Sequence, residues 1–218
     1  MQIRTTIIKF SEIKLATRDA HKLRGYFSKL FKEHSTILHN HLDSGESNYR
    51  YPLVQYKVIK NVPMLVGINE GGKLLTSLFL KISELDINGQ IYPVYHKNIE
   101  NRINEIDVAD DLFQYNFETL WLGLNQKNFR IYSKASQEEK NKLLKKTLVG
   151  NILSFFKGIG YFTGNKIMLT ANLSEKETKF KDKIMVAFSG NFVCNAILPD
   201  YVGLGKSVSR GFGCIIKK

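Results

Sequence analysis

Residues 51–82 of the chain, YPLVQYKVIKNVPMLVGINEGGKLLTSLFLKI, decide the fold. Residues 51–60 are rich in β-branched and aromatic side chains, which is typical of a strand, and residues 61–63 (NVP) predict a turn. A short return strand is expected over 64–69, and the helical run KLLTSLFLKI follows over 73–82. The segment therefore predicts a strand–strand–helix unit.

The sequence on either side extends this unit. Upstream, residues 2–10 (QIRTTIIKF) predict a strand, and apolar positions at helical spacing predict an amphipathic helix from Thr17 to about Glu33. Downstream, Asn88-Gly89 is a turn signal, and residues 90–106 alternate as one long strand. The resulting order, β-α-β-β-α-β, is the ferredoxin-like split βαβ arrangement.

The second half of the chain is expected to repeat this arrangement less completely. A helix should begin at Ser136, because SQEE is a capping box with Glu139 three residues on. The place of a second helix is taken by residues 196–213, so that helix is expected to be missing or very short. Strands are predicted over 115–122, 128–132, 166–173 and 183–194, with a charged turn SEKETKFKD at 174–182 and a closing CIIKK at 214–218.

The fold predicted from these patterns is α+β, with two ferredoxin-like (βαββαβ, RRM-like) domains in tandem, the second degenerate. A chain of 218 residues is long enough for two small domains of about 100 residues each. The boundary is expected near Asp107–Asp111, which gives an N-terminal domain over 1–108 and a C-terminal domain over 109–218.

The charge of the chain favours a polyanionic partner. There are 32 Lys and Arg against 20 Asp and Glu, a net charge of +12, of which residues 109–218 carry +8. A basic solubility surface would give the same composition, and the charge does not separate RNA from DNA. No apolar run is long enough for a membrane span, and two cysteines without CxxC spacing exclude a disulfide framework and a zinc knuckle. The expected location is the cytoplasm.

The most specific stretch is GLGKSVSRGFG, residues 203–213. Two Gly-hydrophobic-Gly pairs enclose Lys206, Ser207, Ser209 and Arg210. Glycines let backbone N–H groups approach a phosphate, and the basic and hydroxyl side chains add donors, so the loop is suited to a phosphodiester backbone. It matches neither the nucleotide P-loop nor the Rossmann fingerprint. The alternative is a tight structural turn before the last strand.

A pair of histidines, His39 and His41 in LHNHL, is the candidate catalytic group. RNA cleavage without a metal needs one group to deprotonate the 2′-OH and another to protonate the leaving 5′-oxygen, and imidazoles supply both forms near neutral pH. A spacing of two puts both rings on one side of an extended segment. A nearby tyrosine could orient the nucleophile, and Lys57 could offset the charge of the phosphorane.

Other interpretations of the pair stay open at this point. A His-x-His in a polar loop can simply be exposed, and it can be half of a zinc site, although no clustered carboxylates or nearby cysteines support a metal. A 2H-phosphoesterase needs two His-x-Thr/Ser motifs, which the chain lacks. His21 and His96 are interpreted as structural.

The paired-glycine loop near the end of a basic chain with two ferredoxin-like halves resembles the glycine-rich loop of the RAMP superfamily of CRISPR-associated RNA-binding proteins. Within that superfamily, the chain resembles the repeat-processing endoribonucleases, the sixth Cas family. The resemblance implies that the loop contacts RNA, through Gly203, Gly205, Lys206, Ser207, Ser209, Arg210, Gly211 and Gly213.

The histidines fit one branch of that family, which carries two histidines separated by a single residue and a tyrosine a short way downstream. The resemblance therefore implies catalytic roles for His39, His41 and Tyr49, with Tyr51 as a close competitor for the tyrosine. It also implies a metal-independent endoribonuclease without a cofactor, which cuts CRISPR repeat (pre-crRNA) transcripts to leave a 2′,3′-cyclic phosphate and a 5′-hydroxyl.

Two alternatives to this enzyme remain. The chain could be a non-catalytic RAMP subunit that binds guide RNA in a CRISPR effector complex, or an unrelated RNA-binding protein of ferredoxin-like fold. The aromatic RNP signature of an RRM is absent, which disfavours the last. The expected partner is CRISPR repeat RNA, with a homodimer and an effector complex left open.

Overall fold

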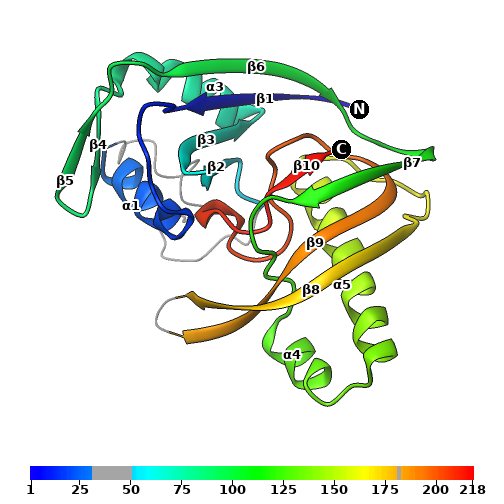
Figure 1. The fold of residues 1–218 in the computed structure, drawn as a ribbon. Coiled ribbons are helices and arrows are strands. Elements are labelled where there is room, and N and C mark those ends of the chain that lie inside the picture. Colours follow the sequence, from blue (N-terminus) through cyan, green and yellow to red (C-terminus); the bar gives the residue numbers. More distant parts are fainter. Residues whose placement is uncertain (31–50, 181–182) are drawn as a thin grey trace, which may run out of the picture. The chain divides into compact units, whose positions relative to one another are not determined.

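The computed structural model describes residues 1–30, 51–180 and 183–218 (Figure 1). The chain divides into two compact units. The first unit holds Met1–Glu105 together with Val208–Gly211, and the second holds Ile106–Ser207 together with Phe212–Lys218. Along the sequence, the division therefore falls between Glu105 and Ile106, whereas the sequence patterns place it near residue 108.

The first unit is a four-stranded antiparallel sheet of order β2-β3-β1-β6. If the strands are numbered in chain order, this is the 4-1-3-2 order of the ferredoxin-like arrangement, so the predicted βαββαβ topology is confirmed. Its elements are β1 (Gln2–Lys9), η1 (Thr17–Asp19), α1 (Ala20–Leu30), β2 (Val54–Ile59), β3 (Val62–Ile68), α3 (Glu70–Leu78), η3 (Phe79–Lys81), β4 (Glu84–Ile87), β5 (Gln90–Pro93) and β6 (Asn98–Glu105).

Apolar residues at helical spacing attach both helices to this sheet. On α1 the buried residues are Ala20, Leu23 and Phe27, and the Phe27 ring stacks on Tyr56 of β2 with 5.9 Å between ring centroids. The helix α3 adds Leu74, Leu75 and Leu78 to the same core. The amphipathic patterns read from the sequence thus build one continuous core beneath the sheet.

The long strand predicted over 90–106 is wrong. The chain instead forms a separate β4–β5 hairpin and then the strand β6. Asn88 and Gly89 both have positive φ, 58° and 83°, which is the geometry of a tight hairpin turn. Pro93 at the end of β5 has no amide hydrogen to continue a ladder, so the alternating pattern is interrupted there.

The second unit repeats the sheet order of the first. Its strands lie in the order β10-β7-β9-β8, which is again 4-1-3-2. The connection between β9 and β10 contains only the short 3-10 turn η4, so the prediction of a degenerate second domain without a full second helix is confirmed. Its elements are β7 (Asp107–Phe117), α4 (Gln126–Tyr132), α5 (Gln137–Gly158), β8 (Leu169–Phe180), β9 (Lys183–Ile197), η4 (Val208–Arg210, which belongs to the first unit) and β10 (Ile215–Lys217).

The long helix α5 covers this sheet and begins where the capping box predicts. The Glu139 amide donates to Ser136 Oγ at 3.4 Å, and the Ser136 amide donates to the Glu139 carboxylate at 2.8 Å. The residues that α5 buries are Leu144, Leu148, Ile152, Phe155 and Phe156. None of the helices in the described part of the chain is long and apolar enough to cross a membrane.

Three predictions for the second unit are wrong. Residues 128–132 form part of α4 and not a strand, because Asn125 caps the helix by accepting the amide of Asn128 at 2.7 Å. The expected turn at 174–182 mostly continues β8 as a ladder with β9 to Phe180. The charged residues of this stretch up to Lys179 are solvent-exposed, so they do not interrupt the ladder. The expected strand 115–122 ends with β7 at Phe117, and beyond it Trp121 forms a single bridge to Phe188.

Candidate functional site

The residues predicted for catalysis, His39, His41 and Tyr49, lie outside the described residues. In the sequence they belong to the connection from α1 to β2 of the first unit. Their roles therefore stay predictions. The competing tyrosine, Tyr51, is described: it is partly buried, and Gln55 Nε2 donates to its hydroxyl oxygen at 2.8 Å.

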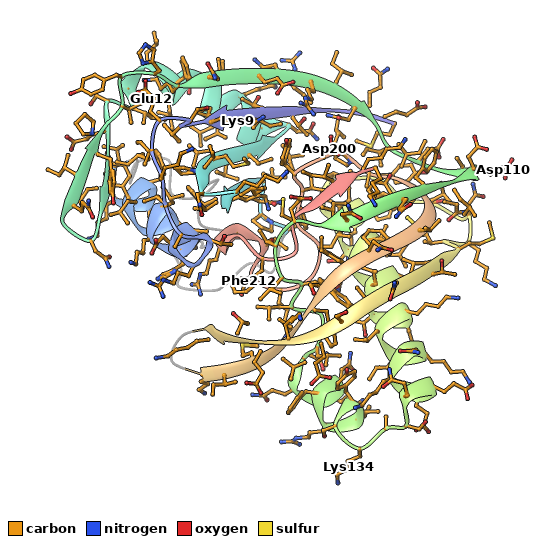
Figure 2. All side chains as sticks on the ribbon, in the orientation of Figure 1. Lys9, Glu12, Asp110, Lys134, Asp200 and Phe212 are labelled. Carbon is orange, nitrogen blue, oxygen red and sulfur yellow. The ribbon has the colours of Figure 1, made fainter. Side chains whose placement is uncertain are left out.

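The two histidines interpreted as structural both contact other residues of the first unit. His21 Nδ1 lies 2.7 Å from the carbonyl oxygen of Arg18 in the turn before α1. His96 Nδ1 lies 2.6 Å from a carboxylate oxygen of Glu12, which Figure 2 labels. Neither contact requires a bound ligand.

The strand β2 is more buried than its place at the sheet edge would suggest. All six of its residues are buried, because α1 and η4 both pack against it. Tyr56 and Lys57 have no exposed surface. Burial raises the pKa of the Tyr56 hydroxyl above its ordinary value, and the charge of Arg24 opposes that rise. Lys57, considered from the sequence as a charge near the reacting phosphate, is therefore a core residue of this unit.

The flanks of the glycine loop fold tightly within the second unit. Gly203 forms a bridge with Cys214, and the Leu204 amide donates to the carbonyl of Gly213 at 2.9 Å. Gly213 has a φ of 64°, and a Cβ added there would lie 2.0 Å from the carbonyl oxygen of Leu204. A side chain at this position would collide with backbone, so glycine is required for the loop to close.

The ring of Trp121 explains why residue 205 is a glycine. Gly205 has a φ of 92°, and a Cβ at this position would lie 2.7 Å from the indole nitrogen of Trp121. That nitrogen donates to Asn151 of α5 at 3.0 Å, which fixes the ring beneath the loop. The structural-turn interpretation of the glycines is therefore correct at Gly205 and Gly213, whatever the loop also binds.

Four backbone amides of the loop are engaged within the chain. The amides of Leu204, Lys206, Gly211 and Gly213 all donate to chain carbonyls, those of Lys206 and Gly213 to Leu122 and Leu120 respectively, at 2.9 Å. These four amides are therefore not free to bind a phosphate, and of the four residues Lys206 alone has a side chain that could hold one. Lys206 is exposed, and Ser207 next to it is partly exposed.

The middle of the loop, Val208–Gly211, belongs to the first unit. Ser209 and Arg210 are partly exposed there, and Gly211 is buried. A Cβ on Gly211 would lie 2.6 Å from the Cβ of Ala20, so glycine allows the loop to meet the start of α1. Burial, and after it the charge of Arg24, lowers the pKa of Arg210. Arg24 was missed by the sequence analysis, because no local pattern links α1 to residues near the C-terminus.

The first unit also carries an open pocket of about 560 Å³ between α3, β1 and β6. Two of its three basic side chains already have partners, since Lys73 pairs with Glu70 at 2.8 Å and Arg102 with Glu100 at 2.6 Å. Within the described part of the chain, no three His, Cys, Asp or Glu side chains are grouped to hold a metal ion. The lining residues of the pocket are Arg4, Lys73, Thr76, Ser77, Asn101, Arg102 and Ile103.

Comparison with known proteins identifies relatives over the whole chain. An uncharacterized protein of Methanocaldococcus jannaschii is 37% identical over 143 residues, which cover 64% of this chain and 96% of that protein. A crystal structure of Cas6b is 36% identical and matches with a TM-score of 0.95 over 100% of both chains. A crystal structure of a CRISPR RNA processing endoribonuclease Cas6b is 33% identical, with a TM-score of 0.82, again over 100% of both chains.

Two family models divide the chain between them. The Cas6b N-terminal domain matches residues 1–105, and the Cas6b C-terminal domain matches residues 107–218. These ranges follow the division between the two compact units along the sequence. The predicted resemblance to the sixth Cas family and its RAMP fold is thereby confirmed. This chain belongs to the Cas6b family.

Proposed function

We propose that this chain is a metal-independent endoribonuclease that cleaves CRISPR repeat transcripts within their repeats. The observation that carries the proposal is the match, complete over both chains, to a crystal structure of a CRISPR RNA processing endoribonuclease Cas6b. The net charge of +12 fits an RNA substrate. The proposal places the protein in the cytoplasm.

The proposed reaction is an attack by the 2′-oxygen on the adjacent phosphorus. The bond from the 2′-oxygen to phosphorus forms, the bond from phosphorus to the 5′-oxygen breaks, and a 2′,3′-cyclic phosphate and a 5′-hydroxyl result. One imidazole of the pair His39 and His41 accepts the 2′-hydroxyl proton, and the other, protonated, donates to the leaving 5′-oxygen. Tyr49 orients the nucleophile or stabilises the phosphorane.

The glycine loop is proposed to hold the RNA backbone. Because several of its amides are engaged within the chain, the contacts come from the side chains of Lys206, Ser207, Ser209 and Arg210. The role of Gly203, Gly205, Gly211 and Gly213 is then to shape the loop so that these side chains face the substrate.

The test uses a labelled repeat RNA from the host and excess EDTA. The expected result is cleavage at one position, resistant to EDTA and abolished by a 2′-deoxy sugar at the nucleotide that supplies the nucleophile. Mass spectrometry of the products should show a 2′,3′-cyclic phosphate and a 5′-hydroxyl. Loss of cleavage in EDTA would contradict the mechanism, and tight binding without cleavage would favour a non-catalytic subunit of an effector complex.

The same samples report on the oligomeric state. Sedimentation of the protein with and without the uncleavable 2′-deoxy RNA distinguishes one copy per RNA from a homodimer on RNA. The proposed chemistry needs only one chain, so a monomer that cleaves is compatible with it.

A further inference from the structure

Two arginines far apart in the sequence lie on elements that pack together in the first unit. Arg24 lies on α1, and Arg210 ends the turn η4, which packs against α1 and β2. Ala20 and Arg24 are four residues apart, so they lie on one face of the helix, one turn from each other. Gly211, which follows Arg210 directly, touches Ala20: a Cβ there would lie 2.6 Å from the Ala20 Cβ. The backbone therefore brings Arg210 to the helix face that carries Arg24.

The charges of this pair support the same placement. After burial, the charge of Arg24 is the second cause that lowers the pKa of Arg210. The charge of Arg24 also lowers the pKa of the Tyr56 hydroxyl in β2, against the larger rise caused by burial. Two guanidinium groups that sit close together in a partly desolvated place repel each other, and a bound anion relieves that repulsion.

Arg24 also carries a hydrogen-bond donor in need of an acceptor. Its Nε is buried and has no hydrogen-bond partner among the described residues, and the same holds for the Tyr56 hydroxyl. Arg24 also forms no ion pair with a carboxylate in that part of the chain, whereas Lys22 on the same helix pairs with Asp19 at 2.7 Å. A cationic donor in this state is typical of a site that receives its anion from a ligand.

We propose that Arg24 and Arg210 together hold one phosphate group of the RNA backbone. Each guanidinium is a planar fork that matches two oxygens of a phosphate, and two forks can share its two non-bridging oxygens. The proposal rests on the proposed function, because it assumes that the chain binds repeat RNA. It adds a residue outside the glycine loop and assigns both arginines to the same phosphate.

The experiment compares neutral and charged linkages in the RNA. A repeat RNA with a 2′-deoxy sugar at the scissile nucleotide binds without being cleaved. In a set of such RNAs, one phosphate at a time is replaced by a methylphosphonate, which carries no charge. Each methylphosphonate follows a 2′-deoxy nucleotide. The control for each is the same RNA with an ordinary phosphate at that linkage. Dissociation constants are measured for the wild type, Arg24→Gln, Arg210→Gln and the control Lys29→Gln, which removes one exposed charge from another face of α1.

The expected result is one linkage at which neutralisation weakens binding of the wild type and of Lys29→Gln by about tenfold. At that same linkage Arg24→Gln and Arg210→Gln should each lose only about threefold, because one of the two partners of the phosphate is already gone while the other remains. Arg24→Lys keeps the charge but not the fork, so it should retain part of the sensitivity. Thermal melting checks that each variant is folded. If Arg24→Gln does not fold, Arg24→Lys replaces it in the comparison.

Two outcomes overturn the inference while leaving the function intact. In one, the wild type cleaves and binds the repeat, but both variants keep the full sensitivity of the wild type at every linkage. In the other, the two variants lose sensitivity at different linkages, which means that the arginines contact different phosphates. If the wild type neither binds nor cleaves repeat RNA, the proposed function fails and this inference fails with it.

Discussion

The two units have sheets with the same strand order and differ in the connection between the third and fourth strands. Both have the strand order 4-1-3-2, but the third and fourth strands are joined by α3 in the first unit and by the glycine loop in the second. The helix α3 places Leu74, Leu75 and Leu78 in the core. In the second unit the long helix α5 supplies that burial, so the connection is free to form a loop with exposed polar side chains.

Glycine marks the crowded point of the connection in each unit. In the first, a Cβ on Gly71 at the start of α3 would lie 2.3 Å from the carbonyl oxygen of Leu53. In the second, the crowded glycines are Gly205 and Gly213 of the loop. The comparison suggests that the second unit uses close backbone packing to fix a loop, where the first uses it to seat a helix.

The largest expected effect on stability comes from Gly213→Ala. Positive φ and a collision with the Leu204 carbonyl should together cost about 3 kcal/mol of the free energy of unfolding. Urea unfolding followed by circular dichroism measures it. The control is Gly150→Ala in α5, where a Cβ has open space, and there a gain of about 0.5–1 kcal/mol is expected. Equal stability of the two variants would contradict the described loop.

The helix cap of α5 should have a smaller effect. Ser136→Ala removes the side chain of the capping box and should cost about 1 kcal/mol in the same assay. Ser133→Ala is the matched control, because its hydroxyl donates only to the carbonyl of Arg130 at 3.2 Å, and a change within about 0.5 kcal/mol is expected. If both serines cost the same, the cap is not what starts α5.

Lys206→Ala tests the binding role of the loop in the second unit. Loss of one phosphate contact should weaken binding of the uncleavable repeat about threefold and reduce the slope of log K against log salt by about 0.7. The matched control is Lys134→Ala, on the turn between α4 and α5 (Figure 2). This variant should leave the binding affinity and the salt slope unchanged. An unchanged salt slope for Lys206→Ala would remove this lysine from the RNA site.

The smallest expected effect is a pH dependence at the start of β7. The Tyr161 hydroxyl and the Val108 amide both donate to the Asp107 carboxylate, at 2.8 Å each, and hold the pKa of Asp107 below its ordinary value of 3.8. Because the folded pKa is depressed, this contribution to stability is present above pH 3.8 and is lost as the pH falls through the folded value.

Melting temperatures from pH 6 to pH 3 therefore provide the measurement. The difference between the wild type and Asp107→Asn should narrow toward the acid end. Asp111→Asn, an exposed residue of the same strand, is the control and should follow the wild type across the range. A constant difference for Asp107→Asn would contradict the assigned hydrogen bonds.

Local signals in the sequence predicted the parts of the fold that depend on neighbouring residues. The capping box at Ser136 and the turn at Asn88-Gly89 act within a few residues, and both are found in the structure. The NFRIY segment misled because its aromatic and β-branched residues favour strands, while the short cap at Asn125 selects a helix. Patterning alone also could not show that a charged segment continues a hairpin ladder.

The candidate site also has features that local sequence predicts and features that depend on the folded chain. The glycine loop is recognisable from its spacing, but the contacts of Gly205 with Trp121 and of Gly211 with Ala20 depend on the folded chain. The neighbourhood of Arg24 and Arg210 likewise exists only after η4 packs on α1. The roles of His39 and His41 stay predictions from the sequence and the family.

The most direct test of the account is single-turnover cleavage by the double variant His39→Ala, His41→Ala at saturating repeat RNA in EDTA. Loss of both proton transfers should reduce the cleavage rate by about 10²- to 10⁴-fold. The dissociation constant of the uncleavable RNA should stay within about twofold of the wild-type value. A cleavage rate equal to that of the wild type would contradict the assignment of catalysis to the histidine pair.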